Sequence, residues 1–412
     1  MQTHLAPEFK NSPDGLEAEA ILRKCVHCGF CTATCPTYQL LGDELDGPRG
    51  RIYLIKQVLE GEAPTRKTQL HLDRCLTCRN CESTCPSGVE YGHLVDIGRK
   101  LVDERVPRPV GEKALRWALK EGLPSSLFAP AMKAGQAVRS LLPAALKNKV
   151  PQKQDAGAWP QRTHARKMLM LEGCVQPAMM PNINAATARV LDAAGIQTVV
   201  APKAGCCGAV KFHLNDHEGG KAEMRRNIDA WWPHVESAAQ SNGVEAIVMN
   251  ASGCGVTVKE YGHMLKDDPA YAAKAARISD LTRDLSELMP ELIGELQGKV
   301  SAKGGAMVFH PPCTLQHGQQ LRGGVETLMR ALGFDVKLAA SESHLCCGSA
   351  GTYSVLQPDI AYQLRDRKLA NLQAAAPQAI ISANIGCITH LQSGTATPVR
   401  HWIEVLDDAL QP

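Results

Sequence analysis

One arrangement of cysteines occurs twice near the start of this 412-residue chain and limits how that region can fold. Residues 25–36 and residues 75–86 both read C-x2-C-x2-C-x3-C-P. Cysteines two residues apart place three sulfurs on one short loop, and the fourth comes directly before a proline. Sulfurs packed this closely mostly cannot reach the geometry of a disulfide. The two runs are therefore predicted to bind metal.

The spacing is that of bacterial ferredoxins, which hold [4Fe–4S] clusters and in which the fourth cysteine ligates the other cluster. The sequence thus predicts two [4Fe–4S] clusters with exchanged fourth ligands. The predicted ligands are Cys25, Cys28, Cys31 and Cys85 for cluster 1, and Cys75, Cys78, Cys81 and Cys35 for cluster 2. Structural zinc is the alternative, but zinc ribbons use cysteine pairs and need no third cysteine two residues further on.

Composition restricts the remaining classes. Sixteen cysteines and a polar start without the apolar segment of a secretory signal favour a reducing, cytoplasmic compartment. No run approaches the roughly 18 apolar residues of a membrane-spanning helix, so we expect a soluble or peripheral protein. A net charge of +3 gives little support to nucleic-acid binding.

The first part of the chain is predicted to be mostly helical. Helix formers or an apolar stripe occupy residues 16–24, 52–59 and 68–74, and we expect a two-cluster domain over residues 1–105. The loop between the cysteine runs carries Arg49 and Arg51, which either donate towards a cluster or partner or pair with neighbouring carboxylates.

A Pro-rich, partly helical linker is predicted over residues 106–166, with a basic end. Its apolar side chains either pack on the protein's own body, which we favour, or lie on a membrane or partner. These side chains are Leu127, Phe128, Met132, Val138, Leu141 and Leu142.

The remainder contains an internal repeat, predicted as units over residues 167–300 and 301–412. Each copy offers a strand, a helix, a strand, a Cys-Cys-Gly (CCG) doublet, a long helix and a buried strand before a last cysteine. The fold class is therefore α+β overall: a mostly helical ferredoxin-like module, then a duplicated α/β domain with short parallel sheets.

Every cysteine of the repeat follows the carboxyl end of a predicted strand, where sites collect in open parallel sheets. We expect four sulfurs to converge in each unit as a redox or metal site, with packing as small core residues the alternative. The candidates are Cys174, Cys206, Cys207 and Cys254 in the first unit, and Cys313, Cys346, Cys347 and Cys387 in the second.

Residues 25–61, 251–254, 313–317, 346–353 and 400–404 closely resemble the glycolate oxidase (glycolate dehydrogenase) iron–sulfur subunit, of the ferredoxin plus CCG-domain family. The resemblance implies an electron relay without a catalytic site of its own. Flavin-bearing partner subunits would oxidise glycolate to glyoxylate, and electrons would pass towards the membrane quinone pool. It implies a peripheral position on the cytoplasmic face of the inner membrane. Related lactate or glycerol-3-phosphate dehydrogenase subunits are an alternative.

A self-contained reductase of the heterodisulfide-reductase type is a second alternative. Such CCG domains end in C-x2-C, which supplies a fifth sulfur, whereas here Thr257 and His390 stand at those positions. His390 is either a nitrogen ligand or, as we favour, a polar residue near a helix start. No dinucleotide or phosphate-loop motif is present, so we expect no flavin on this chain.

Overall fold

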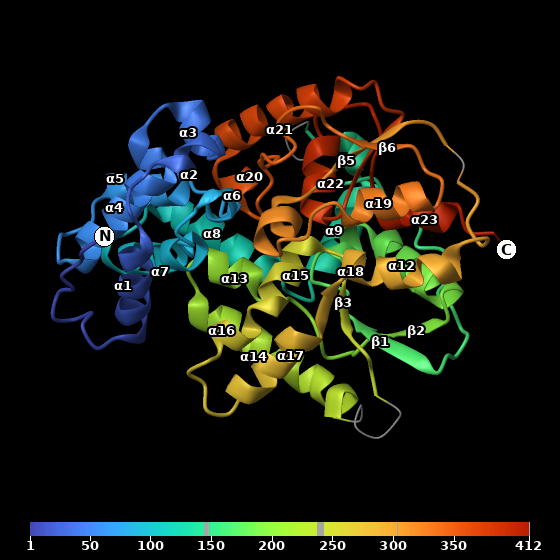
Figure 1. Cartoon of the computed structure of the whole chain (residues 1–412), viewed down its shortest axis with the longest axis horizontal. Helices are drawn as coiled ribbons and strands as arrows, with labels where there is room; N and C mark the ends of the chain where they lie inside the picture. The colour runs from blue at the N-terminus through green and yellow to red at the C-terminus, as the bar shows by residue number, and fades with distance from the viewer. Residues whose placement is uncertain (144–146, 148, 237–242, 303, 412) are drawn as a thin grey trace.

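The computed structural model describes residues 1–143, 147, 149–236, 243–302 and 304–411. A helical N-terminal domain lies at one end of the molecule, and two α/β units form the remainder (Figure 1). The first unit runs from green to yellow and the second from orange to red, and the two chain termini lie at opposite ends (Figure 1).

Short helices enclose the two cysteine loops of the N-terminal domain. They are α1 (Pro13–Lys24), α2 (Phe30–Ala33), α3 (Pro36–Leu41), η1 (Glu44–Asp46), α4 (Pro48–Leu59), α5 (Arg66–Asp73), α6 (Asn80–Thr84) and α7 (Tyr91–Arg105). The three predicted helices are present, but α1 and α4 begin earlier than expected. Each starts at a proline, whose fixed φ suits the first helical position.

The segment after α7 is partly helical, as predicted. It contains α8 (Val110–Gly122), α9 (Phe128–Ala137) and η2 (Arg139–Leu141), none of which buries a residue. Leu127 is 74% exposed and Leu141 is 83% exposed, so packing on the protein's own body is wrong for these two side chains. Phe128 and Met132 are half-buried, and for them that expectation holds.

Each α/β unit is built on a four-stranded sheet, with strand orders β2-β1-β3-β4 and β6-β5-β7-β8. All pairings are parallel, which confirms the predicted fold class. The strands are β1 (Arg166–Met170), β2 (Ile196–Val199), β3 (Ile247–Met249), β4 (Thr282–Asp284), β5 (Met307–His310), β6 (Val336–Leu338), β7 (Ala379–Ser382) and β8 (Val399–His401). Strands β4 and β8 were not predicted, because β4 contains only polar residues and β8 has a single apolar residue, Val399.

Helices cover both sheets. In the first unit they are α11 (Gln176–Met179), α12 (Pro181–Ala193), α13 (Ala209–His213), α14 (His217–Glu236), α15 (Ser252–Lys259), α16 (Tyr261–Met264), α17 (Ala272–Leu281) and α18 (Leu285–Leu296). In the second unit they are η4 (Thr314–Gly318), α19 (Gly324–Ala331), α20 (Tyr353–Leu356), α21 (Pro358–Gln373), α22 (Ile385–Gln392) and α23 (Trp402–Asp408). Equivalent helices follow equivalent strands, as a duplicated unit requires.

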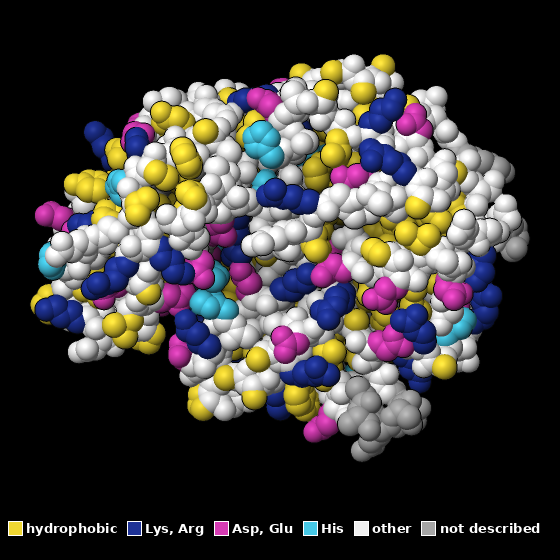
Figure 2. All heavy atoms as spheres, in the orientation of Figure 1, with side chains coloured by type: hydrophobic (Ala, Val, Ile, Leu, Met, Phe, Trp, Pro, Cys, Tyr) yellow, Lys and Arg dark blue, Asp and Glu magenta, His cyan; other side chains and the backbone are white. Residues whose placement is uncertain are grey.

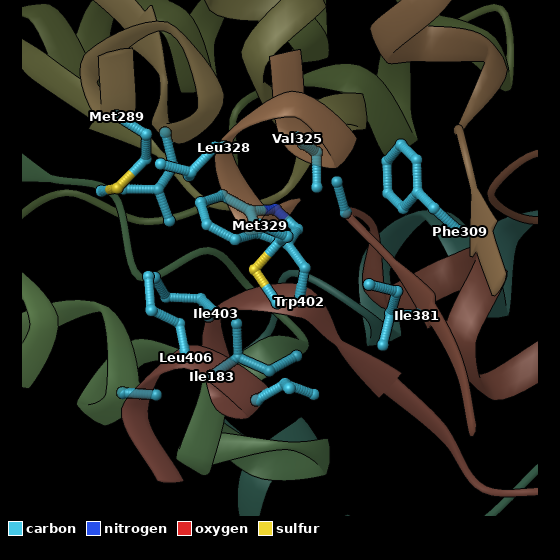
Figure 3. Packing of buried hydrophobic residues seen from close by; sticks show 14 of the residues in the cluster. Ile183, Met289, Phe309, Val325, Leu328, Met329, Ile381, Trp402, Ile403 and Leu406 are labelled. Atoms are coloured by element: carbon cyan, nitrogen blue, oxygen red, sulfur yellow. The ribbon is translucent and has the colours of Figure 1, made fainter. Parts of the chain in front are cut away.

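One hydrophobic core spans both units, and the first unit has a second, separate core of its own. Figure 3 shows Ile183 and Met289 of the first unit in the same cluster as Phe309, Leu328 and Trp402 of the second. Trp402 is fully buried in this cluster. The relative position of the two sheets is therefore fixed by apolar burial, which stabilises at about 25 cal/mol per Å².

Replacement of this tryptophan tests the shared core. Trp402→Ala is expected to lower the free energy of unfolding by about 3–5 kcal/mol, because it leaves a large cavity between the units. Trp117→Ala is the matched control, since Trp117 is 63% exposed and its loss is expected to cost less than about 0.5 kcal/mol. Urea unfolding followed by circular dichroism measures both, and equal midpoints for the two variants would contradict a shared core.

Candidate functional site

Two small cavities in the N-terminal domain are lined by the cysteines of the two runs. One is lined by Cys25, Cys28, Cys31 and Cys85, with Cys81 also on its wall. The other is lined by Cys35, Cys75, Cys78 and Cys81. Each cavity thus brings the first three cysteines of one run together with the last cysteine of the other. This is the donor set that a cubane needs, and the residues present fit two [4Fe–4S] clusters.

The two cysteine loops adopt the same backbone conformation. His27 and Thr77 hold equivalent positions with φ of 56° and 52°, and Gly29 and Arg79 follow with φ of 85° and 57°. Positive φ is costly for residues other than glycine and persists where the surroundings enforce it. The loops thus turn tightly around their sulfurs, and the Thr77 amide donates to Cys75 Sγ at 3.4 Å.

Burial of the thiols influences their protonation. It raises the pKa of Cys31 to about 11 and raises the pKa values of Cys78 and Cys81 well above their usual range. Without a metal these sulfurs keep their protons, and only a bound cation makes the thiolate favourable. Cluster binding therefore releases protons, as thiolate ligation generally does.

Two arginines bring positive charge beneath the second cysteine loop. Arg51 is 1% exposed and lies 3.5 Å from Asp46, while its Nε donates to the His71 carbonyl at 2.7 Å. Arg99 is also buried and donates to the Leu72 and Cys75 carbonyls. Arg49 pairs with Glu44, and Arg51 pairs with Asp46. Of the two roles predicted for these arginines, both therefore show pairing with a neighbouring carboxylate.

In the second unit, the sulfurs form a connected set. Cys313 Sγ lies 3.8 Å from Cys346 Sγ. The sulfurs of Cys347 and Cys387, the latter in the first turn of α22, lie within 4.8 Å of each other. In the first unit, interaction with Cys206 raises the pKa values of Cys174 and Cys207, and Cys254 raises both further, so the four candidates of this unit also lie near one another. All eight candidate cysteines thus lie in two groups, one group in each unit.

The glycine of each doublet is required by its surroundings. Gly208 has φ +95° and Gly348 has φ +89°, a region that favours glycine. A Cβ atom at Gly348 would lie 2.4 Å from the Ala361 carbonyl oxygen, and one at Gly208 would lie 2.8 Å from that of Gly220. The close approach of each doublet to its long helix therefore needs the CCG sequence.

Two histidines of the second unit differ in their contacts. The partners of His390 are not sulfurs: its Nε2 hydrogen-bonds to the Ala361 carbonyl at 3.1 Å, and its ring stacks on Tyr362. His310, at the end of β5, instead groups with Cys347 and Cys387. Sequence reasoning missed His310. The available signal was a histidine in a buried strand where the first unit has Leu171.

The N-terminal domain contacts the second unit through its sulfur-bearing loop. Leu76 and Cys78 pack in one buried cluster with Cys313 and Cys346. The Tyr353 hydroxyl donates to the Arg74 carbonyl at 2.9 Å across the same contact. The second cysteine run is therefore the part of the N-terminal domain that lies next to the sulfurs of the second unit.

Charged side chains join the N-terminal domain to the first unit, and Figure 2 shows them gathered where that domain meets α16. Arg79 and His93 pair with Glu260, while Glu17 pairs with His263 at 3.0 Å. The two imidazole rings stack with centroids 4.0 Å apart. Lys266 adds a second cation on Glu17. We call this group the charged seam.

A cleft of about 460 Å³ lies between α6 and the second unit. Ser83, His317, Arg322 and Glu326 supply its polar lining, and Phe309 is among its apolar residues. The Ser83 hydroxyl lies 3.0 Å from His317 Nδ1. The cleft thus adjoins the second cysteine run without containing any of its sulfurs.

Comparison with known proteins agrees with this arrangement. Residues 21–89 match the family model described as a 4Fe-4S dicluster domain, and residues 168–259 and 307–392 match that of a cysteine-rich domain. The chain is therefore an iron–sulfur protein with two [4Fe–4S] clusters in its N-terminal domain and a pair of cysteine-rich units. The prediction of two clusters is confirmed.

Full-length relatives identify the family. The chain is 55% identical to the glycolate oxidase iron-sulfur subunit of Escherichia coli (strain K12), over 100% of both chains. It is 30% identical to the probable glycolate oxidase iron-sulfur subunit of Bacillus subtilis (strain 168), over 94% of this chain and 91% of the relative. Lactate utilization protein A of Bacillus licheniformis is 27% identical over 58% of this chain. The chain belongs to the family of glycolate oxidase iron–sulfur subunits.

The charged seam is expected to weaken at both ends of the pH range. Hydrogen bonding to His263 lowers the pKa of Glu17 to about 2, so its contribution is lost as pH falls below 4.5. Burial opposes the charge of His93, but Glu260 raises the pKa of this imidazole above 6.5, so its contribution is lost as pH rises. Arg79 and His263 also face His93.

Hydrogen exchange measures this dependence. Amide protection in α16 of the holoprotein is expected to fall as pH increases from 6.5 to about 8.5, after correction for intrinsic exchange rates. His93→Gln removes the titrating group and is expected to flatten the profile. Identical profiles for the two proteins would show that His93 does not support the docking.

Proposed function

We propose that this chain is the electron-transfer subunit of a membrane-associated glycolate dehydrogenase. It accepts electrons from flavin-bearing subunits that oxidise glycolate to glyoxylate and relays them towards the quinone pool. The observation that carries the proposal is the packing of Cys78 against the buried cluster that contains Cys313 and Cys346, which brings the N-terminal domain beside a second group of sulfurs. The names of the two full-length relatives supply the substrate.

We assign Cys25, Cys28, Cys31 and Cys85 to cluster 1 and Cys75, Cys78, Cys81 and Cys35 to cluster 2. The two lined cavities support this assignment. Such clusters supply one-electron chemistry, which suits the division of a hydride equivalent taken up by a flavin. The chain's own part is to hold the sulfurs, to bury those of Cys25, Cys35, Cys75 and Cys81, and to place the buried Arg51 and Arg99 beside the second cysteine loop.

The domain boundaries complete the proposal. Residues 1–105 form the two-cluster domain, residues 106–166 the linker, and residues 167–300 and 301–412 the cysteine-rich units. The charged seam and the Tyr353–Arg74 hydrogen bond support electron flow within a fixed arrangement of these parts.

The acceptor side is proposed at the cleft beside α6, whose apolar and hydrogen-bonding lining suits a ring such as a quinone. Among the residues that the structure describes, no helix has the length and apolarity to cross a bilayer. We propose peripheral attachment at the cytoplasmic face of the inner membrane. The exposed Trp117, Leu127 and Leu141 are the apolar side chains suited to that contact.

Loss of a single proposed ligand tests the relay. Cys25→Ser is expected to remove one cluster and to reduce glycolate-dependent quinone reduction by the reconstituted complex at least about tenfold, because one step of the relay is missing. Glycolate oxidation with an artificial flavin acceptor is expected to persist. Thr32→Ser, in the same loop, is the control that retains both activities. A Cys25→Ser protein with both clusters and full quinone reduction would disprove the assignment.

Purification of the chain by itself tests the division of labour. Because the proposed flavin lies on other subunits, the chain alone is expected to show no glycolate oxidation with an artificial acceptor. Iron and acid-labile sulfide analysis is expected to give about eight irons for the N-terminal domain. Any iron above eight belongs to the cysteine-rich units. Glycolate oxidation or disulfide reduction by the isolated chain would favour a self-contained reductase instead.

A further inference from the structure

His310 is buried without a hydrogen-bonding partner. The residue is 1% exposed, and neither Nδ1 nor Nε2 has a partner among the described residues. A buried polar group without a hydrogen-bonding partner is unfavourable, because it has lost its bonds to water and gained none. Histidine at this position is therefore unfavourable in a chain that binds nothing there.

The ring lies beside two of the candidate sulfurs. One nitrogen of His310 and the sulfurs of Cys347 and Cys387 all lie within 4.8 Å of one another. A tetrahedral ion with bonds of about 2.3 Å to sulfur and 2.0–2.1 Å to nitrogen places its ligand atoms about 3.6–3.8 Å apart. The three side chains are thus within a small adjustment of the separation that one ion requires. Cys346, next in sequence to Cys347, and Cys313, 3.8 Å from Cys346, offer further sulfurs.

Packing does not explain the presence of a histidine at position 310. The first unit shows which kind of side chain is sufficient to fill the equivalent position. Leu171 precedes Cys174 by three residues in the first unit, as His310 precedes Cys313 in the second. Leu171 is also buried, at 3% exposure. An apolar side chain is therefore sufficient to fill this position in the first unit.

A second difference between the units concerns charge. Lys368 is 2% exposed and donates to the carbonyls of Glu342 and Ser343, just before the second doublet. The equivalent residue of the first unit is Asn227. It follows Gly220, whose carbonyl faces the first doublet glycine, by seven residues, and Lys368 follows Ala361, which faces the second doublet glycine, by the same number. At this position the second unit thus carries a buried cation close to its sulfurs, where it offsets the negative charge of thiolate ligands, and the first unit carries a neutral amide.

We propose that His310 is a metal ligand and that, with Cys347 and Cys387, it binds one transition-metal ion in the second unit. Imidazole and thiolate are the donors of borderline-soft metals, and the ion is either a separate one such as Zn²⁺ or one iron of a cluster. The first unit has no nitrogen donor at the matching position, so the two units hold different centres. The proposal adds a site to the electron relay and does not depend on glycolate as the substrate.

The test uses the full chain, purified without oxygen from cells grown with ¹⁵N-histidine or with natural nitrogen. Metal content is measured by mass spectrometry for the wild type, His310→Leu and His310→Cys. If the ion is zinc, X-ray absorption at the zinc edge is expected to show one nitrogen in the wild type. If it is iron, pulsed electron paramagnetic resonance is expected to show a nitrogen coupling that changes with the label.

His310→Leu introduces the residue that the first unit has at this position, Leu171. It is expected to lower the affinity for the metal at least about tenfold or to abolish the nitrogen signal. His310→Cys is expected to retain the metal with sulfur in place of nitrogen. His390→Leu, which removes a histidine bonded to a backbone carbonyl in the same unit, is the control and is expected to leave the signal unchanged.

The N-terminal cluster signals report folding in every variant, and the cysteine variant remains informative if the leucine variant does not fold. Wild-type protein with no histidine nitrogen on any metal would overturn the proposal. Identical metal content and spectra for the wild type and His310→Leu would also overturn it. Neither measurement uses glycolate oxidation, so failure here is distinct from failure of the proposed function.

Discussion

The packing of Cys78 against the buried cluster that contains Cys313 and Cys346 is the contact on which the rest of the structure depends. Thiolate sites carry negative charge and favour burial only where cations or hydrogen-bond donors surround them. The chain meets this requirement with few residues. Arg51 and Arg99 lie beneath the second cysteine loop, and Lys368 lies behind the second doublet. Buried cations thus stand on both sides of the contact.

The two α/β units hold the second group of sulfurs in place through their shared core. If the first unit packed only in its own separate core, it could move without moving the sulfurs of the second. Trp402 and Met289 instead belong to one cluster, so α18 of the first unit and α23 of the second are fixed together. The charged seam attaches the first unit to the N-terminal domain. Each of the three parts, the N-terminal domain and the two units, therefore contacts both of the others, which fixes their relative orientation.

Much of this arrangement could be predicted from local sequence. The spacing of the two cysteine runs predicted the clusters, because sulfur geometry on a tight loop depends on residues close in sequence. The repeat predicted both sheets, because strands such as 379–382 are continuous apolar runs. Strands β4 and β8 could not be predicted, since neither contains an apolar run and only pairing with β3 and β7 makes them strands. The pairing of Arg79 with Glu260 joins residues 181 positions apart and has no local signal.

The two docking contacts differ in physical kind, and the difference fits their places in the molecule. At the charged seam, ion pairs between partly exposed side chains set orientation, since such pairs contribute little net stability but tolerate few geometries. At the second unit, Leu76, Cys78 and Ile360 exclude water around the sulfurs. Water in that position would solvate the thiolates and separate the two groups. Apolar side chains therefore occur where the two groups of sulfurs must stay close together. Charged pairs occur where only the orientation of the first unit has to be set.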